Sequence, residues 1–180
     1  MSSILGWWRE RSLRREIAAR GWAWTQVNGG EAGPPFGYSV GFDEAFGAPE
    51  MIVFSLPPQI ARIAAERVGE RLRAGEPGFA EGARWQGLVG EGACVWRHIH
   101  PTQLIDDYFA AALSRRREGA GERRAFTACQ LVWPDEGGLF PWERGCAFQT
   151  RAEQVPLYEA RDLANPDSWL EDIRREAAAP

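Results

Sequence analysis

The sequence predicts an α+β fold: a single domain over residues 1–180, with about four helices packed on a mixed, mostly antiparallel sheet of about six strands. Three observations predict this class. The chain has 180 residues and is 44% hydrophobic, which suits one compact domain with a core. Short β-branched and aromatic runs alternate with segments of helical periodicity in mixed order. Two such runs are joined by a short glycine-containing connection, which is typical of an antiparallel hairpin.

The first third of the chain predicts one helix and three strands. Apolar residues recur at helical spacing among arginines and glutamates over residues 3–19, and Gly21 ends this helix. Residues 28–35 are rich in glycine and proline and form a loop. The predicted strands around and after this loop cover residues 22–27, 36–42 and 50–56.

The remainder predicts three helices, a hairpin and two further strands. Apolar residues recur at helical spacing from Ile60 to Leu72, and Gly75 is the expected stop. Pro101 begins a second helix with an apolar face. Residues 165–167 open the final, C-terminal helix, expected over 166–177. The predicted hairpin strands are 84–90 and 93–100, followed by a strand at 125–133 and a short edge strand at 155–160.

Composition excludes several function classes. The net charge of −4 and the isoelectric point near 5.3 argue against binding to nucleic acid or to anionic membranes. The absence of lysine removes Schiff-base and P-loop lysines. Three cysteines without paired spacing, together with an N-terminus unlike a signal peptide, predict reduced thiols in the cytoplasm. No run approaches the ~18 consecutive apolar residues that a membrane span needs.

Four segments in order carry a family resemblance. They are Gly21-Trp22, "PPFGYSVGF" at 34–42, "PEMIVFSLPP" at 49–58 and "QLVWPDEGGLFPWE" at 130–143. With these segments the chain resembles the bacterial family called domain of unknown function 4262. That resemblance implies no established reaction, cofactor or catalytic residue.

The last of these segments is the most conspicuous. Its prolines fix φ and its two glycines permit positive φ, so we expect a strand, a tight turn and a second extended segment over residues 130–145. We interpret it first as a structural hairpin and second as the rim of a binding site. Together with a tyrosine and a glutamate in the earlier segments, it supplies the predicted ligand-binding residues: Tyr38, Glu50, Gln130, Trp133, Asp135, Trp142 and Glu143.

Two positions in these segments leave alternatives open. Ser39, next to Tyr38, could be a nucleophile, but the alternation with Phe36 and Val40 favours core packing. Glu50 begins an otherwise apolar strand, so its carboxylate either binds main-chain amides or an arginine internally, or faces a pocket.

His98 and His100 are the two histidines of the chain and share a face of a predicted strand, a spacing that suits one metal ion. A third ligand would have to come from elsewhere, with Asp135, Glu143 or a cysteine as candidates. The alternative is that His98 is a half-buried strand residue and His100 caps the helix at Pro101.

The leading functional hypothesis is a cytoplasmic module that binds an unknown small molecule or protein and has no catalysis of its own. It depends on what the chain lacks: lysine, a nucleophile elbow and a phosphate loop. The alternative is a small-molecule enzyme, either a metal-assisted hydrolase using His98 and His100 or a flavin-binding oxidoreductase on a split barrel. No catalytic residue is assigned, the cofactor is unknown, and a homo-oligomer is compatible with the sequence.

Overall fold

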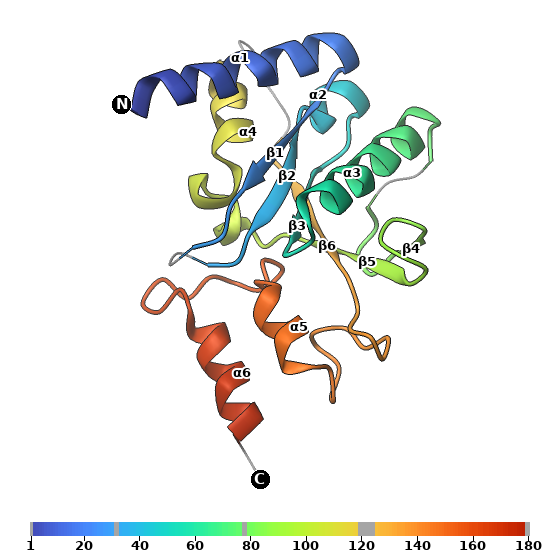
Figure 1. Ribbon diagram of the computed structural model, residues 1–180, viewed down its shortest axis with the longest axis vertical. Coiled ribbons are helices and arrows are strands. Elements are labelled where there is room, and N and C mark those ends of the chain that lie inside the picture. The colour runs from blue at the N-terminus through green and yellow to red at the C-terminus, as the bar shows by residue number, and fades with distance from the viewer. Residues whose placement is uncertain (1, 31–32, 77–78, 119–124, 179–180) are drawn as a thin grey trace.

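The computed structural model describes residues 2–30, 33–76, 79–118 and 125–178. In this part of the chain six helices surround one six-stranded sheet, so the predicted α+β class is confirmed (Figure 1). The elements in order are α1 (Ser2–Arg20), β1 (Ala23–Val27), β2 (Phe36–Val40), α2 (Phe42–Phe46), β3 (Glu50–Phe54), α3 (Pro58–Arg73), β4 (Arg84–Gln86), β5 (Ala93–His98), the 3₁₀ turn η1 (Pro101–Gln103), α4 (Asp106–Glu118), β6 (Ala128–Val132), α5 (Phe148–Glu153) and α6 (Ser168–Ala178).

The sheet has the strand order β1-β2-β3-β6-β5-β4. All neighbours are antiparallel except β3 and β6, which run parallel. Within the described residues β1 and β4 are the two edges, and they do not pair with each other. The sheet is therefore open, which removes the barrel analogy behind the flavin hypothesis.

Side chains of the central strands alternate between two cores because successive residues of a strand point to opposite faces. In β3, Met51 and Val53 belong to the core that contains the apolar stripe of α3. Ile52 and Phe54 belong to the core on the other face, with Phe109 of α4. This burial on both faces explains why β3 is a continuous apolar run.

The four predicted helices correspond to α1, α3, α4 and α6, and the short helices α2 and α5 were not predicted. The helix expected from Pro101 is split. A single 3₁₀ turn comes first, and α4 begins only at Asp106, after Leu104 leaves helical geometry with ψ 67°. None of the helices in the described ranges is both long and apolar enough to cross a membrane.

The edge strand predicted at 155–160 is wrong. The Gln130 side chain takes the main-chain groups that a strand would pair: its Nε2 donates to Val155 O at 2.9 Å, and its Oε1 accepts from Leu157 N at 3.0 Å. Residues 155–160 are therefore bound to the Gln130 side chain of β6 and do not extend the sheet.

The hairpin predicted over 130–145 is only half correct. The strand ends at Val132, and a tight turn follows in which Gly138 N donates to Asp135 O at 2.9 Å and Asp135 N donates to Leu139 O at 2.8 Å. No second strand follows, because the next main-chain bonds are again local, from Glu143 N to Phe140 O at 2.8 Å.

Candidate binding groove

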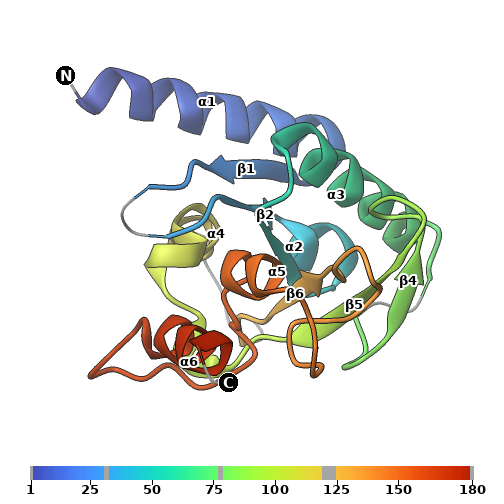
Figure 2. The same ribbon diagram turned by 60° about the horizontal axis from the view of Figure 1, so that its bottom comes forward.

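A groove of about 520 Å³ lies between α1, β1 and α4, within the range of about 300–1,000 Å³ that is usual for ligand sites. Figure 2 shows α1 running above β1 on the outer side of the sheet. The residues that line the groove are Glu10, Ser12, Leu13, Arg14, Glu16, Trp24, Thr25, Gln26, Tyr38, Ala110, Ala111, Ser114, Arg115 and Glu118.

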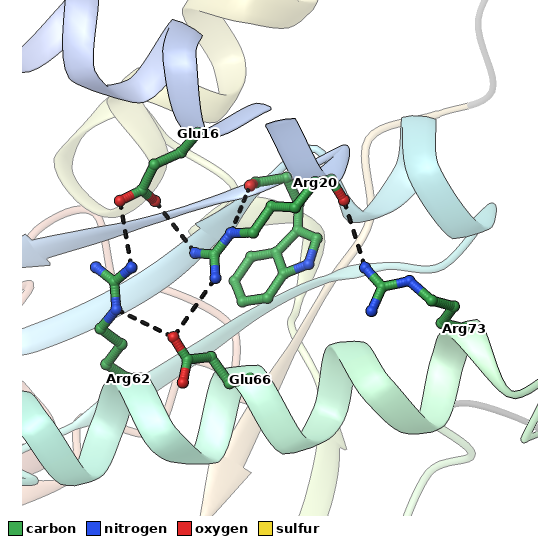
Figure 3. Close-up of polar contacts among 6 residues, drawn as sticks. Glu16, Arg20, Arg62, Glu66 and Arg73 are labelled. Atoms are coloured by element: carbon green, nitrogen blue, oxygen red, sulfur yellow. Dashed lines mark hydrogen bonds and ion pairs between the residues drawn. The ribbon is translucent and has the colours of Figure 1, made fainter. Parts of the chain in front are cut away.

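The α1 wall is held by apolar and charged contacts. Leu13 and Ile17 are one helical turn apart and pack into the core beneath α4. At the helix end, Arg20 binds Glu16 at 3.1 Å and Glu66 of α3 at 3.5 Å (Figure 3). The Arg20 guanidinium also lies 3.9 Å from the centroid of the Trp22 ring. The C-terminal half of α1 is therefore fixed to the sheet and to α3.

The network at this end includes two further arginines. Arg62 of α3 binds Glu16 at 3.3 Å and Glu66 at 3.2 Å, which closes a ring of alternating charges. Arg73 donates to the main-chain oxygen of Arg20 at 3.5 Å (Figure 3). Single exposed pairs contribute only about 0–1 kcal/mol each, so the arrangement matters as a network.

The floor of the groove is a cross-strand pair. Thr25 of β1 lies directly opposite Tyr38 of β2. The Tyr38 hydroxyl accepts a hydrogen bond from Ala111 N at 3.1 Å. That amide is available because Phe109, at φ −132° and ψ 28°, interrupts the helical bonding of α4.

Two hydroxyls in the floor have unusual surroundings. Burial raises the pKa of Tyr38, and the Ala111 amide and the Thr25 side chain oppose that rise. Thr25 Oγ1 is itself buried, and among the described residues it has no hydrogen-bond partner of normal geometry. Because this oxygen is covered, the two hydroxyls belong to the packing beneath the groove surface.

The charges around the groove are paired. Arg14 of α1 binds Glu10 at 2.6 Å and reaches Glu118 of α4 at 3.4 Å. Arg115 binds Glu44 with its Nη2 at 2.6 Å. The groove therefore presents an apolar interior with a neutralised rim.

Of the residues predicted for ligand binding, only Tyr38 lines this groove. Glu50 is buried and accepts hydrogen bonds from Ser39 Oγ and, at 2.8 Å, from Gly41 N. Burial raises the pKa of Glu50, while these donors oppose the rise. The open alternative for Glu50 is thus answered: its carboxylate binds main-chain amides at the turn into α2.

Gln130 and Trp133 belong to a segment, residues 130–158, that we call the latch segment. Besides the Gln130 bonds given above, Trp133 Nε1 donates to Phe54 O at 2.9 Å. The Gln154 side chain, which the sequence did not single out, bonds both main-chain groups of Trp133, with its Oε1 at 3.1 Å and its Nε2 at 2.9 Å. Buried amides here replace strand pairing.

Asp135 and Glu143 also bind main-chain amides of the latch segment. Asp135 accepts from Ala147 N at 2.8 Å and from Leu139 N at 2.9 Å, and these donors hold its pKa below the usual value. Glu143 accepts from Phe140 N at 2.7 Å. Both carboxylates shape their own loop.

Trp142 lies on the surface beside an arginine. It stacks on Phe140 with ring centroids 5.2 Å apart, and the Arg97 guanidinium lies 4.7 Å from its ring. The Tyr158 ring lies 4.2 Å from the same guanidinium and 5.7 Å from the Trp142 ring, so the three side chains contact one another. This cluster is separate from the groove lining.

The two histidines do not share a strand face, because β5 ends at His98. His98 Nε2 lies 2.6 Å from Phe79 O. His100 Nδ1 accepts from Thr102 N at 3.3 Å and so caps the 3₁₀ turn, as the alternative reading expected. No group of three or more metal-ligating side chains is found in the ranges that the structure describes.

Sequence reasoning missed most of the groove. Leu13 and Thr25 were placed on the correct elements, but nothing in their local pattern indicates that α1 and α4 leave space between them. The orphaned Thr25 hydroxyl became visible only with the packing.

The comparisons with known proteins add a family. No curated protein and no solved structure matches the chain. The sequence model of the family described as a domain of unknown function, DUF4262, matches residues 16–147, which is more than half of the chain. The match leaves out the first turns of α1 and all of α5 and α6. Through it, the resemblance noted in four sequence segments is confirmed, and the chain belongs to the DUF4262 family.

Proposed function

We propose that this protein is a binding module whose site is the groove between α1, β1 and α4. The observation that carries the proposal is the groove itself: about 520 Å³ with Leu13, Tyr38 and Ala111 in its lining. A largely apolar pocket with few polar groups is the usual form of a ligand site.

The lining indicates the chemistry of the ligand. Arg14 and Arg115 already have carboxylate partners, so a charged ligand would have to break ion pairs at the rim. The interior offers Leu13, Ala111 and Tyr38 to an uncharged apolar group.

Binding without catalysis is supported by the hydrogen bonds that the carboxylates of the predicted site residues accept. Glu50, Asp135 and Glu143 accept hydrogen bonds from main-chain amides. A carboxylate held in this way is stabilised where it stands and makes a poor general base for a substrate. A cytoplasmic location and the absence of a nucleic-acid partner remain part of the proposal, on the charge of the chain.

The experiment fills the groove. The uncharged apolar dye N-phenyl-1-naphthylamine is titrated into the protein and into Ala110→Phe, which adds a ring at an exposed position of the lining. We expect the dye affinity to fall about tenfold, equivalent to about 1.4 kcal/mol. Ala177→Phe, at an exposed position on α6, is the matched control and should bind as the native chain does.

Equal dye binding by both variants, or no dye binding by the native chain, would refute the groove as a binding site. Circular dichroism melts of both variants establish that the fold is unchanged.

A further inference from the structure

The edge strand β1 has main-chain groups without partners. In the described residues β1 pairs only with β2. Apart from that pairing, no hydrogen bond between described residues reaches a main-chain N–H or C=O of residues 23–27. In an antiparallel pair alternate residues direct these groups away from the partner strand. The outer side of β1 is thus a row of unpaired donors and acceptors.

The groove reaches this outer side. Three consecutive residues of β1, Trp24, Thr25 and Gln26, line it. Consecutive side chains of a strand point to opposite faces, so a groove that touches all three must include the edge between the faces. The polar edge of β1 is therefore part of the candidate site.

The side chains of β1 leave that edge uncovered. The Trp24 indole lies flat on Gly37 of β2, where an added Cβ would come within 2.2 Å of Trp24 Cζ2. Gln26 Nε2 donates to Phe36 O at 3.0 Å, again toward β2. Both long side chains are held inward, over the neighbouring strand.

The residues of β1 do not carry the sequence features that discourage pairing at an edge strand, which are short length, charge and proline. The other edge, β4, has three residues and begins with Arg84. β1 has five residues, Ala23–Val27, with no charge and no proline. Helix α1 flanks β1 on its outer side instead, and the groove separates the two along part of their length (Figure 2).

We propose that the groove binds an extended peptide, which adds to β1 as a further strand. This inference rests on the proposed function and names its ligand class. A row of main-chain groups at strand spacing is matched by an extended peptide main chain. Helices α1 and α4 both contribute lining residues to the groove beside β1.

The lining defines the peptide further. Alternate side chains of the added strand face the apolar wall formed by Leu13, Tyr38 and Ala111. These side chains are uncharged and apolar, because the rim arginines are already paired with glutamates.

The test uses random heptapeptides displayed on phage and selected on the full-length protein. An enriched sequence is synthesised, and each of its main-chain amides is methylated in turn. We expect affinity to fall at alternate positions, by about 3- to 10-fold for each lost main-chain hydrogen bond, and to change little at the positions between. Ala110→Phe should weaken the peptide and Ala177→Phe should not.

Hydrogen exchange gives a second measurement on the protein. Outward-facing main-chain amides among Trp24, Thr25 and Gln26 should exchange more slowly with the peptide bound. Loss of affinity without a two-residue period, or no enriched peptide that depends on the open groove, would overturn strand addition.

The dye titration separates the two proposals. If the dye binds in a groove-dependent manner while peptides fail, the binding site stands and the peptide class is wrong. If light scattering finds a concentration-dependent dimer that Ala110→Phe abolishes, the occupant is a second copy of the chain and the peptide proposal is equally overturned.

Discussion

The latch segment and the groove differ in whether their polar groups have hydrogen-bond partners. In the latch segment Gln130, Asp135 and Gln154 direct side-chain oxygens and nitrogens onto main-chain groups of their own region. In the groove, Thr25 Oγ1 and the outer edge of β1 have no such partners among the described residues. The unusual sequence of residues 130–145 therefore serves the structure of its own loop. The edge of β1, which has unpaired hydrogen-bonding groups, has no unusual sequence.

The largest expected effect is on the free energy of unfolding, after the Gln130 hydrogen bonds of the latch segment are removed. Gln130→Leu removes both hydrogen bonds of a buried amide, after which Val155 O and Leu157 N keep only the bond that they make to each other at 2.9 Å. A lost hydrogen bond costs about 0.5–1.5 kcal/mol, so the free energy of unfolding should fall by about 2 kcal/mol in a urea titration.

Gln149→Leu is the matched control. Gln149 is exposed, and its amide bonds Glu153 within the same helix at 2.6 Å. Its free energy of unfolding should stay within about 0.5 kcal/mol of the native value. Similar losses in the two variants would mean that the latch bonds have no special weight.

The next expected effect concerns the pH dependence of stability. Burial raises the pKa of Glu50 above its ordinary value of 4.5. Between 4.5 and the raised value the folded state keeps a proton that the unfolded state has lost, so the free energy of unfolding falls as pH rises. Glu50→Gln should remove this slope in urea titrations from about pH 4 to about pH 8.

Asp135→Asn serves as the comparison of opposite sign. The amides around Asp135 lower its pKa below 3.8, so its contribution is present above that pH and lost as pH falls further. The variant should change only the acid limb. Parallel curves for the native chain and Glu50→Gln would contradict the buried, proton-retaining role of Glu50.

The sequence predicted the fold better than the site, for a physical reason. The continuous apolar run in Glu50–Phe54 and the helical spacing in Pro58–Arg73 are local signals, and both elements are present. The groove instead depends on how Leu13 and Ala111, far apart in the chain, are spaced across a strand edge. Main-chain groups at an edge have no side-chain signature, so no residue pattern marked them.

The smallest expected effect is an increase in the free energy of unfolding. It tests whether the Thr25 hydroxyl lacks a hydrogen-bond partner. Thr25→Val removes a buried polar atom without a partner while keeping the shape of a β-branched side chain. Because an unsatisfied buried hydroxyl is destabilising, the variant should unfold with a free energy equal to the native value or higher by up to about 1 kcal/mol. Thr102→Val is the control, since the Thr102 hydroxyl accepts from Arg161 N at 2.8 Å and its loss should destabilise by about 1 kcal/mol.

A clear destabilisation of Thr25→Val would mean that Oγ1 has a hydrogen-bond partner, such as the Tyr38 hydroxyl. The hydroxyls of the groove would then be as fully hydrogen-bonded as the side-chain amides of the latch segment. A gain in stability with unchanged peptide binding would place the hydroxyl beneath the groove lining, where it costs folding free energy and a bound segment does not contact it.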